Sequence, residues 1–564
     1  MTDISAPTTL ERIASWACGL RFEDIPERVI HKAKLQMLSM LAAVYSGYPT
    51  RAARAIREVA LASRARGRAT VLPGGDTTSP TAAAMANAAA SMALDYDDYL
   101  FMGHTGHSAV LGSLALAQEM GLGGRDLLRA QIAADEVGGR LGASVILGPQ
   151  NGQLWTHIHA PAAACAGALL LGLDPAACAQ AMALALYQPP MAMWPGFLGP
   201  DSKLLSAACP TRDGLLAARL ASWGLTGPVD ILDVRRGFGD HFAYQFLPQM
   251  LTGFGKTWVT DSLCFKIYPG CAYIDSAIDA LLKAADHFRA DHGRAIEPAD
   301  IVSISVRTGM LGAELERLSG GRRWPRLSPV RINFSIPLSL AVALRAGRLT
   351  PAELDEEALR ESADEIYALA DKVEVRHDWS MTLEMLERMS QAVPLSELLA
   401  ELDLRQLLEL RSELGRQFGG VLDIKPRDLL RISAFLWSRA PNLVRQAGRA
   451  ARNGIGRLVA DEAEGGRGFD LANARLESAS MPLSAAVAIE VAGGDVYEAA
   501  VDLPRGSAGR DPAETRGLVR KKFRAQAARW LPEDRVERAL DKIDRLEDLP
   551  EIDSLTAELI VDQD

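Results

Sequence analysis

Alanine is abundant in almost every stretch of this chain of 564 residues, whereas aromatic residues make up only 6% of it. Hydrophobic residues nevertheless account for 48% of the sequence, so that alanine, leucine, valine and isoleucine must supply most of the apolar surface. Alanine and leucine have high helix propensities, and small side chains allow neighbouring helices to approach closely. We therefore expect a protein that is built mainly from closely packed α-helices.

The charge and the apolar patterning exclude several classes of protein. Charged residues make up 23% of the sequence and the net charge is −10, which is typical of a folded globular protein. A nucleic-acid-binding protein needs a basic surface, so no nucleic-acid partner is expected. The longest apolar stretches, such as Ala160–Leu173, are shorter than the roughly 20 residues of a membrane-spanning helix. Residues Met1–Leu20 lack the pattern of a signal peptide, and we expect a cytoplasmic protein without membrane contact.

Helical patterns punctuated by Gly and Pro fill the chain from Thr9 to about Gly224. Ser79 is a predicted N-cap, with Pro80 in the first turn of the helix that follows. Another helix is expected over Thr211–Trp223. Several of these helices are apolar on nearly all sides, which indicates that they are buried in a large helical body.

The pattern changes after Pro269, where apolar and polar residues begin to alternate as they do in β-strands. Strands are expected over residues 301–307, 372–376, 485–491 and 495–501, and an Ala-Gly-Gly turn joins the last two into a hairpin. Helices are interleaved with them, and a last helical stretch is expected over 514–559. The fold class is therefore mainly α with an α+β part. About a hundred residues between 380 and 480 are rich in Leu, Arg and Glu and have a helical pattern.

The densest group of polar residues lies between two alanine-rich helices. It comprises Asp95, Asp97, Asp98, His104 and His107, in a chain with only nine histidines. A carboxylate bonded to one imidazole nitrogen determines which nitrogen is free to take a proton, so this group is a candidate catalytic base with its orienting partners. The alternative is a set of helix-capping aspartates beside surface histidines.

A second group, Trp155–Pro161, contains His157 and His159. In an extended geometry these two histidines would share a face, although a buried structural histidine is the commoner case. Together with the first group they could bind a metal, because histidine and carboxylate ligands suit Zn, Fe or Mn. No H-E-x-x-H or comparable signature is present, and we assign no metal ligand.

Two lysines stand where they could contact a ligand. Lys203 follows Gly and Pro and leads into an apolar helix that carries Arg212. Lys266 precedes Tyr268 and Cys271 at the join between the helical and the mixed parts, and ligand clefts often form at such joins. A lysine there can bind an anion as a point charge. Taken singly, each lysine is more often a solvated surface residue.

These motifs together resemble the MmgE/PrpD family, which includes 2-methylcitrate dehydratase, cis-aconitate decarboxylase and iminodisuccinate epimerase. The resemblance rests on the D-x-D-D element at 95–98, the His-Ser pair at 107–108, the segment around Lys203 and the K-x-Y-P-x-C element at 266–271, with weaker matches at 333–337 and 521–523. It implies a homodimer with a large all-helical domain built from both chain ends and a smaller α+β domain. We place the helical domain at 1–265, completed by 514–564. The α+β domain is then 266–513, with an insertion at about 380–480 that is not typical of the family.

The resemblance also implies chemistry on small di- or tricarboxylates, without metal or cofactor, in a cleft between the domains. The candidate catalytic residues are Asp95, His107, His159, Lys203 and Lys266. The candidate substrate-binding residues are His104, His157, Arg212, Tyr268 and Cys271.

We therefore expect a lyase that moves a proton next to a carboxylate, with lysines stabilising the developing charge and His107, oriented by Asp95, as acid or base. The expected reaction is dehydration of a citrate-like acid or decarboxylation of an aconitate-like acid. Dehydration is slightly preferred, because the decarboxylase members carry a histidine in place of Cys271. The alternatives are an epimerase or isomerase of a dicarboxylate, a metal-dependent hydrolase and a non-catalytic binding protein. Replacing Lys203 or His107 by alanine is expected to abolish turnover with little change in the melting temperature.

Overall fold

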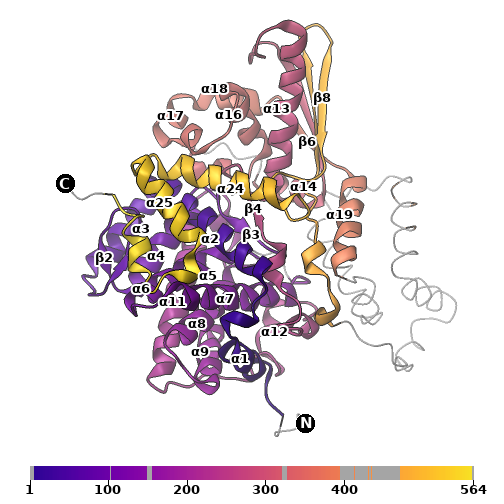
Figure 1. Ribbon diagram of the computed structural model, residues 1–564. Helices are drawn as coiled ribbons and strands as arrows, with labels where there is room; N and C mark the ends of the chain where they lie inside the picture. The colour runs from indigo at the N-terminus through magenta and orange to yellow at the C-terminus, as the bar shows by residue number, and fades with distance from the viewer. Residues whose placement is uncertain are drawn as a thin grey trace, which may run out of the picture.

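The computed structural model describes residues 6–101, 103–148, 155–319, 327–393 and 470–561, together with four single positions between 394 and 469. A helical body and a smaller part around a four-stranded sheet make up the described chain (Figure 1). The expected fold class, mainly α with an α+β part, is confirmed. None of the described helices is long and apolar enough to cross a membrane.

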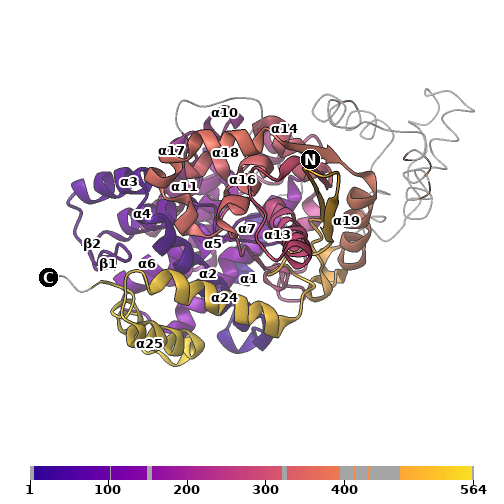
Figure 2. The same ribbon diagram turned by 90° about the horizontal axis from the view of Figure 1, so that it is seen from above.

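The helical body takes helices from both ends of the chain. The N-terminal part supplies α1 (Thr9–Gly19), α2 (Glu27–Gly47), α3 (Arg51–Ala62), α4 (Pro80–Met92), α5 (Gly106–Ala109), α6 (Leu111–Glu119), α7 (Gly124–Ser144), α8 (His159–Leu170), α9 (Pro175–Tyr187), α10 (Trp194–Phe197), α11 (Leu205–Ser222) and α12 (Phe238–Phe242). The C-terminal part supplies α24 (Pro512–Ala527), α25 (Glu533–Asp544) and α26 (Asp553–Thr556). Figures 1 and 2 show α24 and α25 beside the N-terminal helices. The Tyr45 hydroxyl of α2 donates to the carbonyl of Leu559 (2.8 Å), so the two ends share one core.

Small residues bring the central helices into close contact, as the composition predicts. At Gly214 of α11, an added Cβ would lie 2.2 Å from the carbonyl oxygen of Ala160 in α8. At Gly167 of α8, it would lie 2.8 Å from the Cβ of Ala218 in α11. Any larger side chain at either position would force the two helices apart.

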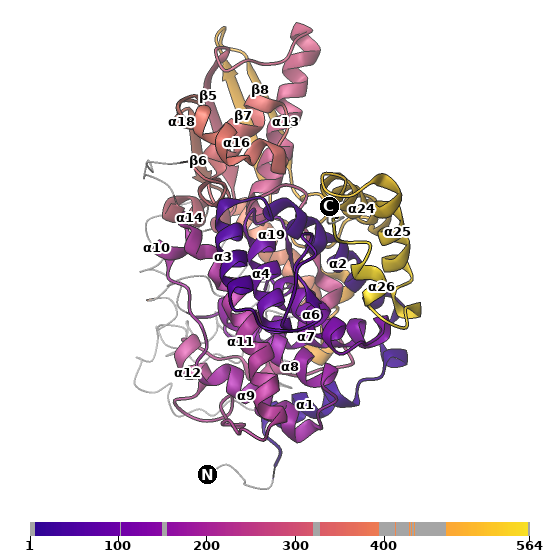
Figure 3. The same cartoon turned by 90° about the vertical axis from the view of Figure 1, so that its left-hand side faces the viewer.

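The α+β part is built on a sheet of order β6-β5-β7-β8, formed by β5 (Ile301–Thr308), β6 (Val373–His377), β7 (Ala485–Val491) and β8 (Val496–Val501). The β5–β6 pair is parallel, and the other two pairs are antiparallel. All four strands lie within two residues of their predicted bounds. Helix α13 (Ala272–His292) packs on β7 and β8, and the rings of Phe288 and Tyr497 are 5.3 Å apart (Figure 3). The remaining helices are α14 (Met310–Ser319), α15 (Pro329–Ile332), α16 (Ile336–Ala346), α17 (Glu356–Glu361), α18 (Ala363–Ala370) and α19 (Trp379–Ala392).

Helix α11 differs from the sequence expectation, because it begins at Leu205 rather than Thr211 and contains Pro210. A proline inside a helix removes one backbone hydrogen bond, but Pro210 is buried and packing keeps the helix continuous. Ser79 caps α4 as predicted and accepts from the N–H of Ala82. The domain limits at 265/266 and 513/514 stay predictions. Most of the predicted insertion, 394–469, lies outside the described residues, apart from the four single positions.

Candidate functional site: a buried ion-pair cluster beside two imidazoles

A two-residue strand pairing assembles the site from segments far apart in the chain. Strand β3 (Asp98–Tyr99) follows α4 and pairs antiparallel with β4 (Cys264–Phe265). The pairing continues past the strands, where the N–H of Lys266 donates to the carbonyl of Asp97 (3.3 Å). Asp95 turns the chain between α4 and β3 with φ of +52°, a left-handed conformation that aspartate tolerates better than most residues.

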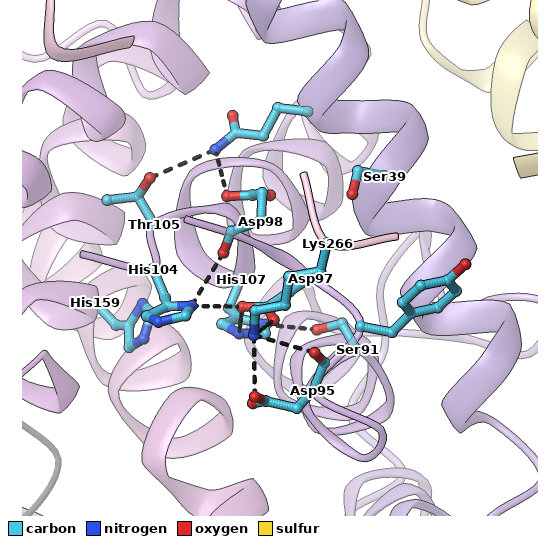
Figure 4. A network of polar contacts seen from close by, with 12 residues as sticks. Ser39, Ser91, Asp95, Asp97, Asp98, His104, Thr105, His107, His159 and Lys266 are labelled. Atoms are coloured by element: carbon cyan, nitrogen blue, oxygen red, sulfur yellow. Dashed lines mark hydrogen bonds and ion pairs between the residues drawn. The ribbon is translucent and has the colours of Figure 1, made fainter. Parts of the chain in front are cut away.

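Two aspartates and two lysines form a cluster of ion pairs, hereafter the Asp–Lys cluster: Asp95, Asp97, Lys203 and Lys266. The Lys203 Nζ lies 2.6 Å from Asp95 Oδ1, and the Lys266 Nζ lies 3.0 Å from Asp95 Oδ2 (Figure 4 draws the Lys266 contacts). Lys266 also contacts Asp97 Oδ1 at 2.5 Å. Both lysine side chains are fully buried, and such charges are tolerated only when they are paired. Two negative and two positive charges balance here.

The pKa values follow this pairing. Burial alone would raise the pKa of Asp95, but the ammonium groups of Lys203 and Lys266 outweigh it and hold that pKa below its usual value. The pKa of Asp97 is lowered well below its usual value against the same burial, with Lys266 as the main cause. The pKa of Lys203 is lowered by burial, whereas the charges of Asp95 and Asp97 raise that of Lys266 despite burial. Lys203 is therefore the lysine that gives up its proton more easily.

His107 lies between Ser91 and Asp97. Its Nδ1 is 2.7 Å from Ser91 Oγ, and that hydroxyl donates its hydrogen to the carbonyl of Ala88. On the other side of the ring, His107 Nε2 lies 3.1 Å from Asp97 Oδ2. The expectation that Asp95 orients His107 was wrong, because both oxygens of Asp95 are bound by lysines. His104 reaches the same Asp97 Oδ2 through its Nδ1 at 2.9 Å (Figure 4).

His159, the first residue of α8, is the second imidazole of the site. Its ring centre is 5.5 Å from that of His107, and its Nδ1 lies 3.1 Å from Ser108 Oγ. The Ser108 hydroxyl donates to the carbonyl of Thr105, so its oxygen accepts from His159 Nδ1–H. The Nε2 of His159 thus carries a lone pair, and within the described parts of the chain it has no hydrogen-bond partner. Burial lowers the pKa of His159 well below its usual value and keeps the ring neutral.

His157 has a different environment from His159. Residues Thr156–Ile158 form a 3₁₀ turn, so the expectation of an extended segment with both histidines on one face was wrong. The His157 ring packs against Phe238 and Phe242, with centroid distances of 5.4 and 4.6 Å. Burial lowers its pKa to about 3.

The other three candidate residues are Cys271, Tyr268 and Arg212, and each has a different environment. Cys271 is the residue that precedes α13, and burial together with the charge of Asp95 raises the pKa of its thiol to about 12. The Tyr268 hydroxyl donates instead to Asp279 Oδ1 (2.7 Å). Arg212 pairs with its neighbour Asp213 (2.7 Å) on the half-exposed side of α11. The structure thus brings together Asp95, His104, His107, His159, Lys203 and Lys266, with Cys271 nearby.

Two residues that contact this site were not selected from the sequence, and Asp97, which was named with the first polar group, was not given a role of its own. Ser91 is an isolated hydroxyl on an alanine-rich helix, and the other residue is Lys522. Lys522 carries the clearest signal, because it shares the buried face of α24 with Val519, Phe523 and Gln526, where a charge is unexpected. A lysine in an apolar helical stripe indicates a specific buried partner.

Among the described residues, no group of three or more His, Cys, Asp or Glu side chains is arranged to hold a metal ion.

Comparison with known proteins gives the family. The MmgE/PrpD N-terminal domain matches residues 11–250, and the MmgE/PrpD C-terminal domain matches residues 268–398. The cis-aconitate decarboxylase of Aspergillus terreus (strain NIH 2624 / FGSC A1156) is 27% identical over 290 residues, which is 48% of this chain and 59% of that protein. The cis-aconitate decarboxylase of Homo sapiens is 28% identical over 309 residues, 52% of this chain and 62% of that protein. The match thus spans about three fifths of these relatives. Both domains of the family are present in order, and the chain belongs to the MmgE/PrpD family.

Proposed function

We propose that this chain is a lyase that acts on a small di- or tricarboxylate by moving a proton next to a carboxylate, without metal or cofactor. The observation that carries the proposal is the meeting of two buried lysines with two imidazoles in one site, where the neutral ring of His159 has an Nε2 without a partner among the described residues. Family membership and the decarboxylase relatives support the same class of reaction.

The two imidazoles suit opposite halves of a proton transfer. His159 is neutral and presents an unpartnered Nε2 lone pair, which is the requirement for a general base. The Nδ1 of His107 lies 2.7 Å from Ser91 Oγ and its Nε2 lies 3.1 Å from Asp97 Oδ2, so the serine and the carboxylate orient this ring between them. We assign His159 as the base and His107 as the acid. Such proton transfer contributes about 10²–10⁴-fold to a rate.

The lysines supply the positive charge that the reaction needs. Loss of a proton next to a carboxylate builds an aci-carboxylate, and a fixed cation at that position lowers the barrier. In the free protein Asp95 neutralises Lys203, so a substrate carboxylate must compete with Asp95 for this ammonium group.

The same groups can assist loss of water from a citrate-like acid or loss of CO₂ from an aconitate-like acid. The names of the relatives favour decarboxylation, whereas Cys271 next to the cluster favours dehydration, because the resemblance to the family implies a histidine at this position in decarboxylases. Incubation with citrate-like acids and cis-aconitate in D₂O, followed by ¹H NMR, separates water loss, CO₂ loss and simple H/D exchange. The His159→Gln variant is the control. Conversion of none of the acids, or equal conversion by the variant, would refute the proposal, and loss of activity with EDTA would favour a metal-dependent hydrolase.

We further propose that the protein is a cytoplasmic homodimer. The exposed side of α11 and the residues after it present Leu205, Leu216, Leu220 and Trp223, and the last is 83% exposed. Large apolar side chains exposed together at the end of a helix, as Leu216, Leu220 and Trp223 are here, are typical of a protein interface. Light scattering after size-exclusion chromatography should give twice the mass of 60.7 kDa, and Leu220→Ser with Trp223→Ser should shift it to the monomer.

A further inference from the structure

Lys522 is a buried lysine outside the proposed proton transfer, yet it contacts both segments that form the Asp–Lys cluster. Its Nζ donates to Ser39 Oγ (2.9 Å), to the carbonyl of Tyr96 (2.7 Å) and to the carbonyl of Lys266 (3.0 Å). Three acceptors use all three hydrogens of an ammonium group. Its Nζ also lies 3.9 Å from the centre of the Tyr96 ring.

The two carbonyl groups belong to the backbone that carries the catalytic charges. Tyr96 stands between Asp95 and Asp97, which are the two carboxylates that bind the Lys266 ammonium. The second carbonyl is that of Lys266 itself. The two segments are also linked by the two-residue β3–β4 pairing, by the ion pairs of Lys266, and by the N–H groups of Lys266 and Gly270, which donate to the carbonyls of Asp97 (3.3 Å) and Asp95 (3.4 Å). These backbone bonds are few and long, so the two charge-assisted hydrogen bonds that Lys522 makes to the carbonyls of Tyr96 and Lys266 add to them.

We infer that Lys522 is a positioning residue, whose ammonium group holds the backbone of Tyr96 and Lys266 so that the Asp–Lys cluster keeps its geometry. The role extends the proposed function, and it makes the C-terminal helix α24 part of the site. The expected effect of Lys522 on turnover rests on the proposed function. The expected effect of Lys522 on the backbone of the cluster does not depend on that function.

Lys522 can hold all three oxygen atoms only while its amine is protonated. A neutral amine has two hydrogens and a lone pair, so one of the three oxygens would lose its donor and face that lone pair. The groups that face Lys522 are Asp97 and Asp98 from the β3 segment, Lys266 after β4 and Asp275 on α13, with Ser39 on α2. Burial lowers the pKa of Lys522 to about 7, while Asp97 and Asp98 partly oppose this. The support should therefore weaken as the pH rises through neutrality.

Hydrogen exchange followed by mass spectrometry tests the inference on the full chain without any substrate. Lys522→Met keeps the length of the side chain and removes its donors, and Lys521→Met is the matched control, because Lys521 is exposed on the same helix. After correction for intrinsic rates, peptides covering 95–100 and 264–271 should exchange roughly tenfold faster or more in Lys522→Met at pH 6. Peptides from α9 should be unchanged. In the wild type, exchange of the same two segments should accelerate with a midpoint near pH 7, and Lys522→Met should lack this step.

A second variant separates Lys522 from other groups that titrate nearby. Ser39→Ala removes one acceptor of the ammonium group, so the midpoint should move to lower pH. Burial also raises the pKa of Asp135 on α7 to about 7, and a midpoint that belongs to that carboxyl group would not move. Equal exchange in Lys522→Met and Lys521→Met, or a midpoint unaffected by Ser39→Ala, would overturn the inference. Where a substrate is turned over, Lys522→Met should lower kcat far more than it changes KM. If the wild type turns over no carboxylate, the proposed function fails, and the exchange data still decide the role of Lys522.

Discussion

The pairing of Lys203 with Asp95 makes a quantitative prediction for a double-mutant cycle. Lys203→Met removes a fully buried ammonium group and keeps the volume of the side chain, and Asp95→Asn removes the opposing charge. Asparagine suits this position, because it tolerates the positive φ of 52° nearly as well as aspartate. The double variant retains the balanced pair of Lys266 and Asp97.

The structure sets the size of each effect. Removing one partner of a buried ion pair costs about 3–5 kcal/mol, because the other charge is left buried and unpaired. The loss of stability in Lys203→Met should lie at the lower limit of this range, because Asp95 still pairs with Lys266. Asp95→Asn leaves the buried Lys203 ammonium group without its carboxylate partner. The double variant removes one charge of each sign, so the two losses should not add. We expect a coupling free energy of about 2 kcal/mol between the two positions.

Urea unfolding followed by tryptophan fluorescence measures these free energies for the four proteins, with Lys521→Met as a surface control that should change stability by less than about 0.5 kcal/mol. Because the pKa of Asp95 is lowered in the folded protein, its contribution to stability is present above the usual carboxyl pKa and is lost only as the pH falls through the lower, folded value. The coupling should therefore persist at pH 5. Additive effects, with a coupling below about 0.5 kcal/mol, would contradict the pairing. The sequence alone predicts little change in the melting temperature when Lys203 is replaced. Because Lys203 is a buried partner of Asp95, we now expect its replacement to destabilise the protein.

Three further predictions concern single residues. His159→Gln should lower kcat by at least about 10²-fold in the NMR assay while the far-ultraviolet circular dichroism stays the same; retained turnover would mean that another group is the base. Burial raises the pKa of Asp135 to about 7, so the folded protein binds a proton there that the unfolded chain releases near pH 4, and the free energy of unfolding falls from pH 4 to 7. The free energy of unfolding of Asp135→Asn, relative to that of the wild type, should thus be higher at pH 8 than at pH 5. Equal shifts of the urea midpoint at the two pH values would refute this. Tyr268→Phe should change KM by less than about threefold and stability by about 1 kcal/mol, because its hydroxyl binds Asp279; a large rise in KM would restore Tyr268 as a substrate-binding residue.

Much of the fold could be predicted from the sequence, because its elements have strong local signals. The alternation at 301–307 and the hairpin around 492–494 fixed three strands to within two residues, and Ser79-Pro80 identified the start of α4. The strand pairing of Asp98 with Phe265 had no such signal, since two residues show no periodicity and their partners are far apart in the chain. The predicted start of α11 was too late, because Pro210 is a local signal against a helix. In the structure the packing of the buried Pro210 outweighs that local cost.

The candidate site was predictable in its residue types but not in its pairing. Asp95, His107 and Lys266 were all selected from the sequence, yet the sequence could not show that both oxygens of Asp95 are bound by lysines. That detail transfers the orienting role at His107 to Ser91 and Asp97. The different environments of His157 and His159 could not be predicted either. They depend on the 3₁₀ turn at Thr156–Ile158, for which the sequence shows no pattern.

The most direct test of the proposed site is a crystal structure of the protein with bound tricarballylate, a citrate-like acid that lacks the hydroxyl group. The proposal predicts one carboxylate within hydrogen-bond distance of Lys203 Nζ, with a neighbouring carbon facing the Nε2 of His159. The Lys203–Asp95 distance, 2.6 Å in the free protein, should lengthen as the ligand takes over the ammonium group. A ligand bound elsewhere, with the Asp–Lys cluster unchanged, would contradict the account.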